Sequence, residues 1–170
     1  VPPYAAVYNM KFPGLYYAYA GIMAIFGQTP YGIRLGLLLV HLASLALLFI
    51  WARRIAGQLA AGIGTAAFAL LALDGWSMAV FAHATHFVVL FVLAGLVTMR
   101  DSRRTWRLVV SGVLFGLAIV MKQQAIPFAA LGIWLGMRGD GSILSRDAIK
   151  RGALVAGGVA ISLLSLVAAM

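Results

Sequence analysis

The sequence contains no cysteine, and only 4 of its 170 residues are acidic. The absence of cysteine excludes a disulfide scaffold and thiolate chemistry. Charged residues make up 10% of the chain and hydrophobic residues 64%, whereas soluble domains have about 25% charged and about 45–50% apolar residues. With a mean hydropathy of +1.01, the chain is predicted to be an all-α, polytopic transmembrane helical bundle, not a disordered chain or a soluble α/β enzyme.

The motifs of soluble enzymes are also missing, since the chain has no glycine-rich phosphate loop, no HExxH and no GxSxG. No signal peptide, internal repeat or soluble domain is visible. The sequence begins Val-Pro-Pro and ends inside an apolar run, so we expect an internal fragment. We expect residues 1–170 to form one transmembrane domain, with an external segment over 1–30 and about six transmembrane helices over 31–170.

Six stretches without Asp, Glu, Lys or Arg are the candidate spans. A spanning helix needs roughly 20 mostly apolar residues. Four stretches reach that range, and the other two are short and are separated by Lys122. The six stretches cover residues 35–52, 55–73, 75–99, 108–121, 123–137 and 152–170.

The positions of the basic residues decide whether the chain turns at Lys122. Loops around residues 53–54, 100–107 and 138–151 hold 10 of the 13 Lys and Arg residues. Because cytoplasmic loops carry an excess of Lys and Arg, all three loops are predicted to lie on the cytoplasmic side. This requires two crossings between the second and third loops, and therefore a reversal at Lys122. The net charge of +9 then reflects topology, and we expect no nucleic-acid partner.

Residues 14–26 form an apolar run that is too short to span and begins with three tyrosines. Aromatic residues on a short apolar helix favour the membrane interface. We predict a helix lying along the outer surface, with a broken or re-entrant core helix as the alternative.

Ionisable groups on the outer side are sparse, and such groups at membrane depth indicate a functional site. Lys11 either meets a phosphate at the headgroup level or anchors the chain by reaching to water. Arg34 either clamps a lipid phosphate or pairs with Asp74. Asp74 is the one acidic residue expected on this side, where it acts as a base, holds a metal, caps a helix or pairs with a cation.

Three histidines are further candidates. His83 and His86 are three residues apart on an expected helix, which places both on one face. Such a pair could bind a metal or a phosphate, shuttle protons, or simply pack. No third metal ligand is evident. His41 is expected near the middle of another span as a hydrogen-bonded core histidine.

Lys122 closes a short span and is followed by Gln123 and Gln124. A lysine with amide neighbours at the apolar boundary suits an anionic headgroup. The alternative is a lysine that only extends its ammonium group to water.

Three motifs occur in a characteristic order: Lys11-Phe-Pro-Gly before the tyrosine-rich run, Phe26-Gly-Gln-Thr-Pro followed by Arg34, and Gly116-Leu-Ala-Ile-Val-Met-Lys122. Over residues 4–137 this order resembles bacterial members of the dolichyl-phosphate-mannose–protein mannosyltransferase-like group, glycosyltransferase family 39. These are polytopic enzymes of the GT-C type. Family members often have an acidic residue near the outer start of the fourth span, where this chain reads His83-Ala-Thr-His86.

The resemblance implies transfer of a sugar from a polyprenyl-phosphate donor to a lipid, glycan or protein acceptor. The reaction is expected at the extracytoplasmic face of the bacterial inner membrane, by inverting displacement. Lys11, Arg34 and Lys122 would contact the phosphate, and His83 and His86 would line the sugar or acceptor pocket. Gln123, beside Lys122, is a further substrate-binding candidate. The family's main catalytic carboxylate is expected before Val1, with Asp74 as a further candidate. No cofactor is certain, and a divalent metal stays open. The alternative function is a transporter or flippase for a lipid-linked or anionic solute.

Overall fold

The computed structural model describes residues 12–72, 83–99, 104–138 and 145–168, and nearly all of these are helical. This confirms the predicted all-α class, because the described residues contain no strand. The elements are α1 (Gly14–Phe26), α2 (Pro30–Ala72), α3 (Ala84–Thr98), α4 (Thr105–Met121), the 3₁₀ turn η2 (Gln123–Ala125), α5 (Ile126–Met137) and α6 (Arg146–Ala168).

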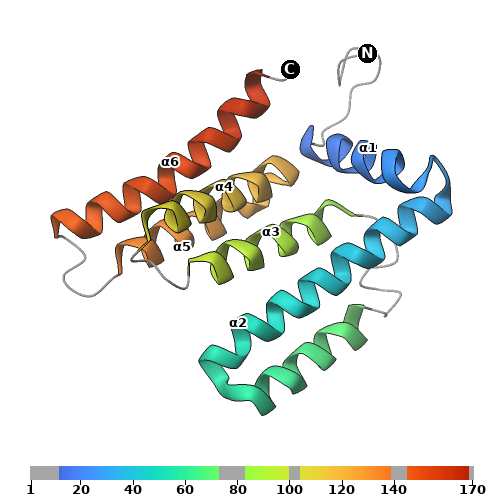
Figure 1. The fold of residues 1–170 in the computed structure, drawn as a ribbon, viewed down its shortest axis with the longest axis horizontal. Coiled ribbons are helices and arrows are strands. Elements are labelled where there is room, and N and C mark those ends of the chain that lie inside the picture. Colours follow the sequence, from blue (N-terminus) through green and yellow to red (C-terminus); the bar gives the residue numbers. More distant parts are fainter. Residues whose placement is uncertain (1–11, 73–82, 100–103, 139–144, 169–170) are drawn as a thin grey trace.

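Helix α2 consists of two arms that meet at Gly57. Gly57 has φ 82° and ψ 172°, a conformation that glycine alone adopts without steric strain. Figure 1 shows the chain turning back on itself at this point. Arg53 and Arg54 come just before the turn, so the predicted break between the first two apolar stretches is confirmed to within a few residues.

The chain also reverses at Lys122, as the distribution of basic residues predicted. Lys122 is extended, with φ −159° and ψ 127°, and it ends α4. After the short η2 turn, α5 returns alongside α4 and α6. Two close approaches show the path of α5. Gly132 lies against Phe115 of α4, and Gly136 lies against Val155 of α6.

The core is organised around α4, which packs against α6, α3, α5 and α1. Its Phe115 side chain is fully buried, with its ring against Gly95 of α3 and Gly132 of α5. Ser111 Oγ donates a hydrogen bond of 2.9 Å to the carbonyl oxygen of Gly95. Through these contacts, both α3 and α5 pack against α4.

Helices α4 and α6 approach each other along glycines. Gly112 faces the backbone of α6 at Val155, and Gly158 faces the backbone of α4 at Val109. Ser162 Oγ donates a 2.9 Å hydrogen bond to the carbonyl oxygen of Val113. Small residues that let two backbones approach, with hydroxyl groups bonding across, are typical of helix pairs in membranes.

Two of the described helices, α2 and α6, are long and apolar enough to cross a membrane by length and composition. The helices α1, α3 and α4 are apolar but shorter, so the predicted count of about six spans is not confirmed. Within the candidate span 75–99, α3 begins only at Ala84, after an extended His83 (φ −89°, ψ 147°), and residues 75–82 lie outside the described residues. Hydropathy could not locate this helix start, since the whole stretch lacks charge.

The adjacent glycines of α6 provide a matched test of the α4–α6 contact. Replacing Gly158 by Ala should lower the free energy of unfolding by about 1–3 kcal/mol, because the new methyl group meets the α4 backbone. Gly157→Ala is the control, since a Cβ there meets nothing within 4 Å, and its stability should be unchanged or slightly raised. Thermal unfolding of both variants in detergent measures the difference, and equal melting temperatures would contradict this packing.

Candidate functional site

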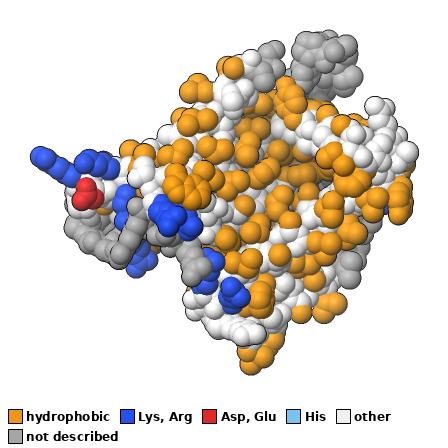
Figure 2. Space-filling model, in the orientation of Figure 1, with side chains coloured by type: hydrophobic (Ala, Val, Ile, Leu, Met, Phe, Trp, Pro, Cys, Tyr) orange, Lys and Arg blue, Asp and Glu red, His pale blue; other side chains and the backbone are white. Residues whose placement is uncertain are grey.

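The two ends of the helix bundle differ in charge. Most of the described Lys and Arg residues lie at one end of the bundle. At this end the first arm of α2 and helix α5 end, and helices α4 and α6 begin. We call this the basic end. Figure 2 shows most of the visible Lys and Arg side chains gathered there, while the rest of that face is largely apolar. Its members are Arg53, Arg54, Arg104, Arg107, Arg138, Arg146, Lys150 and Arg151.

The opposite end, which we call the polar end, contains Lys122 and the start of α3. Lys122 Nζ donates a hydrogen bond of 3.4 Å to Thr85 Oγ1. The same hydroxyl oxygen lies 3.1 Å from His83 Nδ1. Thr85 therefore links the ammonium group at the end of α4 to the imidazole that precedes α3. This places two of the predicted site residues, Lys122 and His83, in one cluster.

The expectation that His83 and His86 share one helix face is wrong. His83 is the extended residue before α3 and is exposed, whereas His86 lies in the first turn of α3 and is half-buried. The His86 ring instead lies against His41 of α2, with 4.5 Å between ring centroids and an angle of 56° between the ring planes. A backbone that is extended at His83 turns the two imidazoles toward different partners.

Sequence reasoning missed Thr85, and it treated His41 as a core histidine rather than as a member of this region. His41 carried a usable signal, because an ionisable residue within an apolar span usually faces the bundle interior. Thr85 carried none, since a threonine between two histidines has no distinctive pattern. The structure shows that Thr85 contacts both Lys122 and His83.

The remaining predicted residues are distributed as follows. Arg34 lies in the second turn of α2, two turns before His41, and is exposed. Gln123 is exposed in η2, directly after Lys122. Lys11 and Asp74 lie outside the described residues, and so does the predicted pairing of Arg34 with Asp74.

The start of α1 lies against the end of α4. Gly14 faces the backbone and side chain of Val120, two residues before Lys122, so α1 begins beside the polar end. In Figure 1, α1 crosses the bundle where α2 begins and α4 ends. The predicted helix over 14–26 is thus confirmed with its bounds, and its place along the membrane surface stays a prediction.

An apolar groove lies within the bundle, and Lys122, Thr85 and His83 are not among the residues that line it. It is a cavity of about 330 Å³ bordered by α2, α3 and α5. On α3 its lining starts at Val88, three residues after Thr85, and continues to Leu96. On α5 it includes Phe128, six residues after Lys122. Its other lining residues include Leu48, Trp51, Phe68, Val92 and Leu131.

The polar end can bind an anion, and nothing in the described ranges assembles a metal centre. Those residues contain no group of three or more His, Cys, Asp or Glu side chains that could hold an ion. Their one carboxylate, Asp147, lies at the basic end. What the polar end offers is an ammonium group, a hydroxyl group and imidazoles, which suit a phosphate or a sugar hydroxyl.

The fold is that of a helical membrane protein, with a cluster of ammonium, hydroxyl and imidazole groups at the end opposite its basic residues. A family model described as dolichyl-phosphate-mannose-protein mannosyltransferase matches residues 10–167. The chain therefore belongs to that family and is a membrane glycosyltransferase of the mannosyltransferase kind, which confirms the resemblance seen in its motifs. No curated protein and no solved structure gives a significant match.

Because the chain lacks cysteine, single introduced cysteines can test which side each end faces. A membrane-impermeant maleimide should label the Gln123→Cys variant in intact spheroplasts, since Gln123 is exposed at the polar end. It should label Arg146→Cys, exposed at the basic end, only after the membrane is permeabilised. Labelling of both variants from one side would contradict the assignment of the two ends to opposite faces.

Proposed function

We propose that this protein transfers a sugar from a polyprenyl-phosphate donor to a lipid, glycan or protein acceptor at the extracytoplasmic face of the bacterial inner membrane. The family supports a glycosyltransferase rather than the transporter or flippase considered from the sequence. The observation that carries the donor assignment is the cluster of Lys122, Thr85 and His83 at the polar end. The apolar groove between α2, α3 and α5 offers a surface for the donor's isoprenoid chain.

The groups at the polar end fit the chemistry of the leaving phosphate. When the bond between the sugar and the phosphate oxygen breaks, negative charge grows on the polyprenyl phosphate. Lys122 Nζ stabilises that charge, and Thr85 Oγ1 holds the ammonium group in place. A fixed cation at the point where charge develops stabilises a transition state more than a ground state.

Arg34 and Lys11 are the further phosphate contacts in this proposal. A guanidinium group near the outer start of α2 can bind two phosphate oxygens at once. The proposal gives His83, His86 and Gln123 the sugar or acceptor side of the pocket, because their rings and amide can hydrogen-bond hydroxyl groups. His41 supports His86 through the ring contact between them.

Removing the lysine charge tests the phosphate contact. Lys122→Ala should lower transfer in the full-length protein by about 100-fold or more, as expected for loss of one group aimed at developing charge. Lys122→Arg should retain part of the activity because the positive charge stays. The measurement is transfer of radiolabelled sugar from a panel of polyprenyl-phosphate donors.

Arg53→Ala serves as the control for the lysine variants, since it removes a cation at the basic end. Its transfer rate should equal that of the parent protein. Normal turnover by a folded Lys122→Ala variant would overturn the assignment of Lys122 to the phosphate.

The groove makes a separate prediction about the donor's chain. Val89→Trp places a large side chain in the groove and should raise KM for a long polyprenyl-phosphate sugar, because the isoprenoid tail then loses its site. A donor with a strongly shortened chain should be affected little. Leu70→Trp, a similar enlargement at an exposed position outside the groove lining, is the control. An equal rise in KM for both donors would assign Val89 a general structural role instead.

A further inference from the structure

The proposed reaction leaves the basic end without a role, and the cations there are concentrated where α5 ends and α6 begins. Arg138 follows the last turn of α5, while Arg146, Lys150 and Arg151 lie in the first two turns of α6. We call these four residues the α5–α6 basic cluster. Asp147 is the one carboxylate among the described residues of this region, and Asp140 lies outside them, so the four cations outnumber the two carboxylates of residues 138–151.

Contacts between the two helices bring the cluster together. Arg151 Nε donates a hydrogen bond of 3.1 Å to the carbonyl oxygen of Gly136 in the last turn of α5. Gly152 of α6 lies against the Met137 side chain. The start of α6 and the end of α5 are therefore adjacent, and their cations share one surface.

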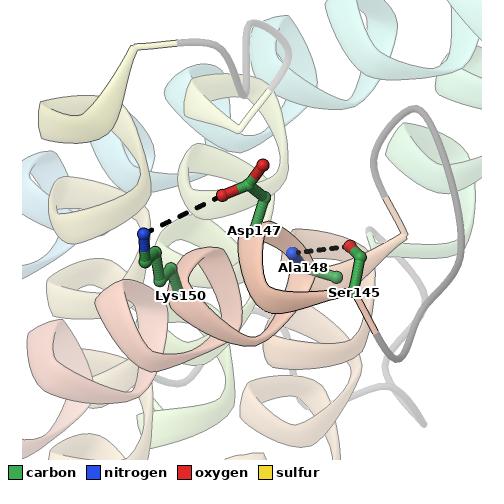
Figure 3. A network of polar contacts seen from close by, with 4 residues as sticks. All are labelled: Ser145, Asp147, Ala148 and Lys150. Carbon is green, nitrogen blue, oxygen red and sulfur yellow. Dashed lines mark hydrogen bonds and ion pairs between the residues drawn. The ribbon is translucent and has the colours of Figure 1, made fainter.

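The local electrostatics favour an external anion. The positive end of the α6 dipole lies where Arg146, Lys150 and Arg151 are found, and cations are unfavourable there. Figure 3 shows that Ser145 caps this turn, with Oγ accepting a 3.1 Å hydrogen bond from the Ala148 N–H, and that Asp147 lies 4.0 Å from Lys150. Because the Lys150 and Asp147 side chains are 76% and 90% exposed, water screens this pair, and Asp147 offsets the charge of Lys150 only weakly.

The cluster borders an apolar surface. The Arg138 guanidinium carbon lies 4.9 Å from the centroid of the Trp134 ring, and that indole is 41% exposed. Ile149, on the first turns of α6, is 54% exposed. Tryptophan and arginine together mark the boundary between headgroups and acyl chains. Arg53 over Phe49 and Arg107 over Trp106 repeat the pattern at the same end.

We propose that the α5–α6 basic cluster binds an anionic phospholipid of the surrounding membrane. Arg138 and Lys150 contact its phosphate and headgroup, and its acyl chains lie along Trp134 and Ile149. A cationic surface beside exposed apolar side chains complements a molecule that has both an anion and hydrocarbon chains, whereas a free phosphate would use only the cations. This site is independent of the proposed transfer reaction and lies at the opposite end of the molecule.

Quenching of Trp134 fluorescence by brominated lipids tests the proposal directly. The full-length protein would keep Trp134, with Trp51, Trp76, Trp106 and any other tryptophan replaced by Phe, and would be reconstituted in phosphatidylcholine vesicles. Brominated phosphatidylglycerol should quench Trp134 with an apparent affinity roughly fivefold above that of brominated phosphatidylcholine. Equal quenching by the two lipids would overturn the proposal.

Variants separate a local site from diffuse attraction. Arg138→Gln combined with Lys150→Gln should abolish the preference for phosphatidylglycerol, while Arg53→Gln, which removes a cation from the same end, should preserve it. A similar loss in all variants would indicate general charge attraction and overturn the site. If the double variant does not fold, Lys150→Gln alone and mass spectrometry of co-purified lipids make the same comparison. Displacement of the lipid by inorganic phosphate, but not by chloride of equal ionic strength, would indicate a free-anion site instead.

Discussion

The close packing of α4 against its neighbours is the constraint on which the rest of the structure depends. Within a membrane, lipid tails are as apolar as leucine, so helices associate through close contact and hydrogen bonds rather than through the hydrophobic effect. Here the Phe115 ring lies between Gly95 and Gly132, and glycines let α4 and α6 meet backbone to backbone. Hydroxyl groups of Ser111 and Ser162 bond across to neighbouring helices. A rigid α4 then determines where its last residue, Lys122, emerges.

Two consequences follow from the position of α4. Its C-terminal end brings Lys122 to Thr85 at the start of α3, which creates the cluster to which the proposed function gives the donor phosphate. Its N-terminal end lies at the basic end, which contains most of the described arginines. The same packing therefore produces two cationic regions of different character, one with a single lysine held by a hydroxyl group and one with many exposed charges.

The sequence predicted the features that depend on composition and on charge placement. The bounds of α1, the break near Gly57 and the reversal at Lys122 all follow from where apolar runs end and where basic residues gather. The extended backbone at His83 could not be predicted, because residues 75–99 carry no charge to mark it. The contact of His41 with His86, and the place of Thr85 between His83 and Lys122, depend on how α2, α3 and α4 align. A single sequence contains no direct signal for such alignment.

The distribution of carboxylates indicates which half of the reaction the polar end serves. Deprotonating an acceptor needs a base, and within the described part of the chain the one carboxylate is Asp147, at the far end of the bundle. The residues at the polar end are instead cations, hydroxyls and imidazoles, which suit the departing phosphate. In the proposed reaction, this cluster therefore binds the donor and stabilises its leaving group, and a carboxylate outside the described residues activates the acceptor. This division accounts for a polar end whose lysine has no acidic partner among the described residues.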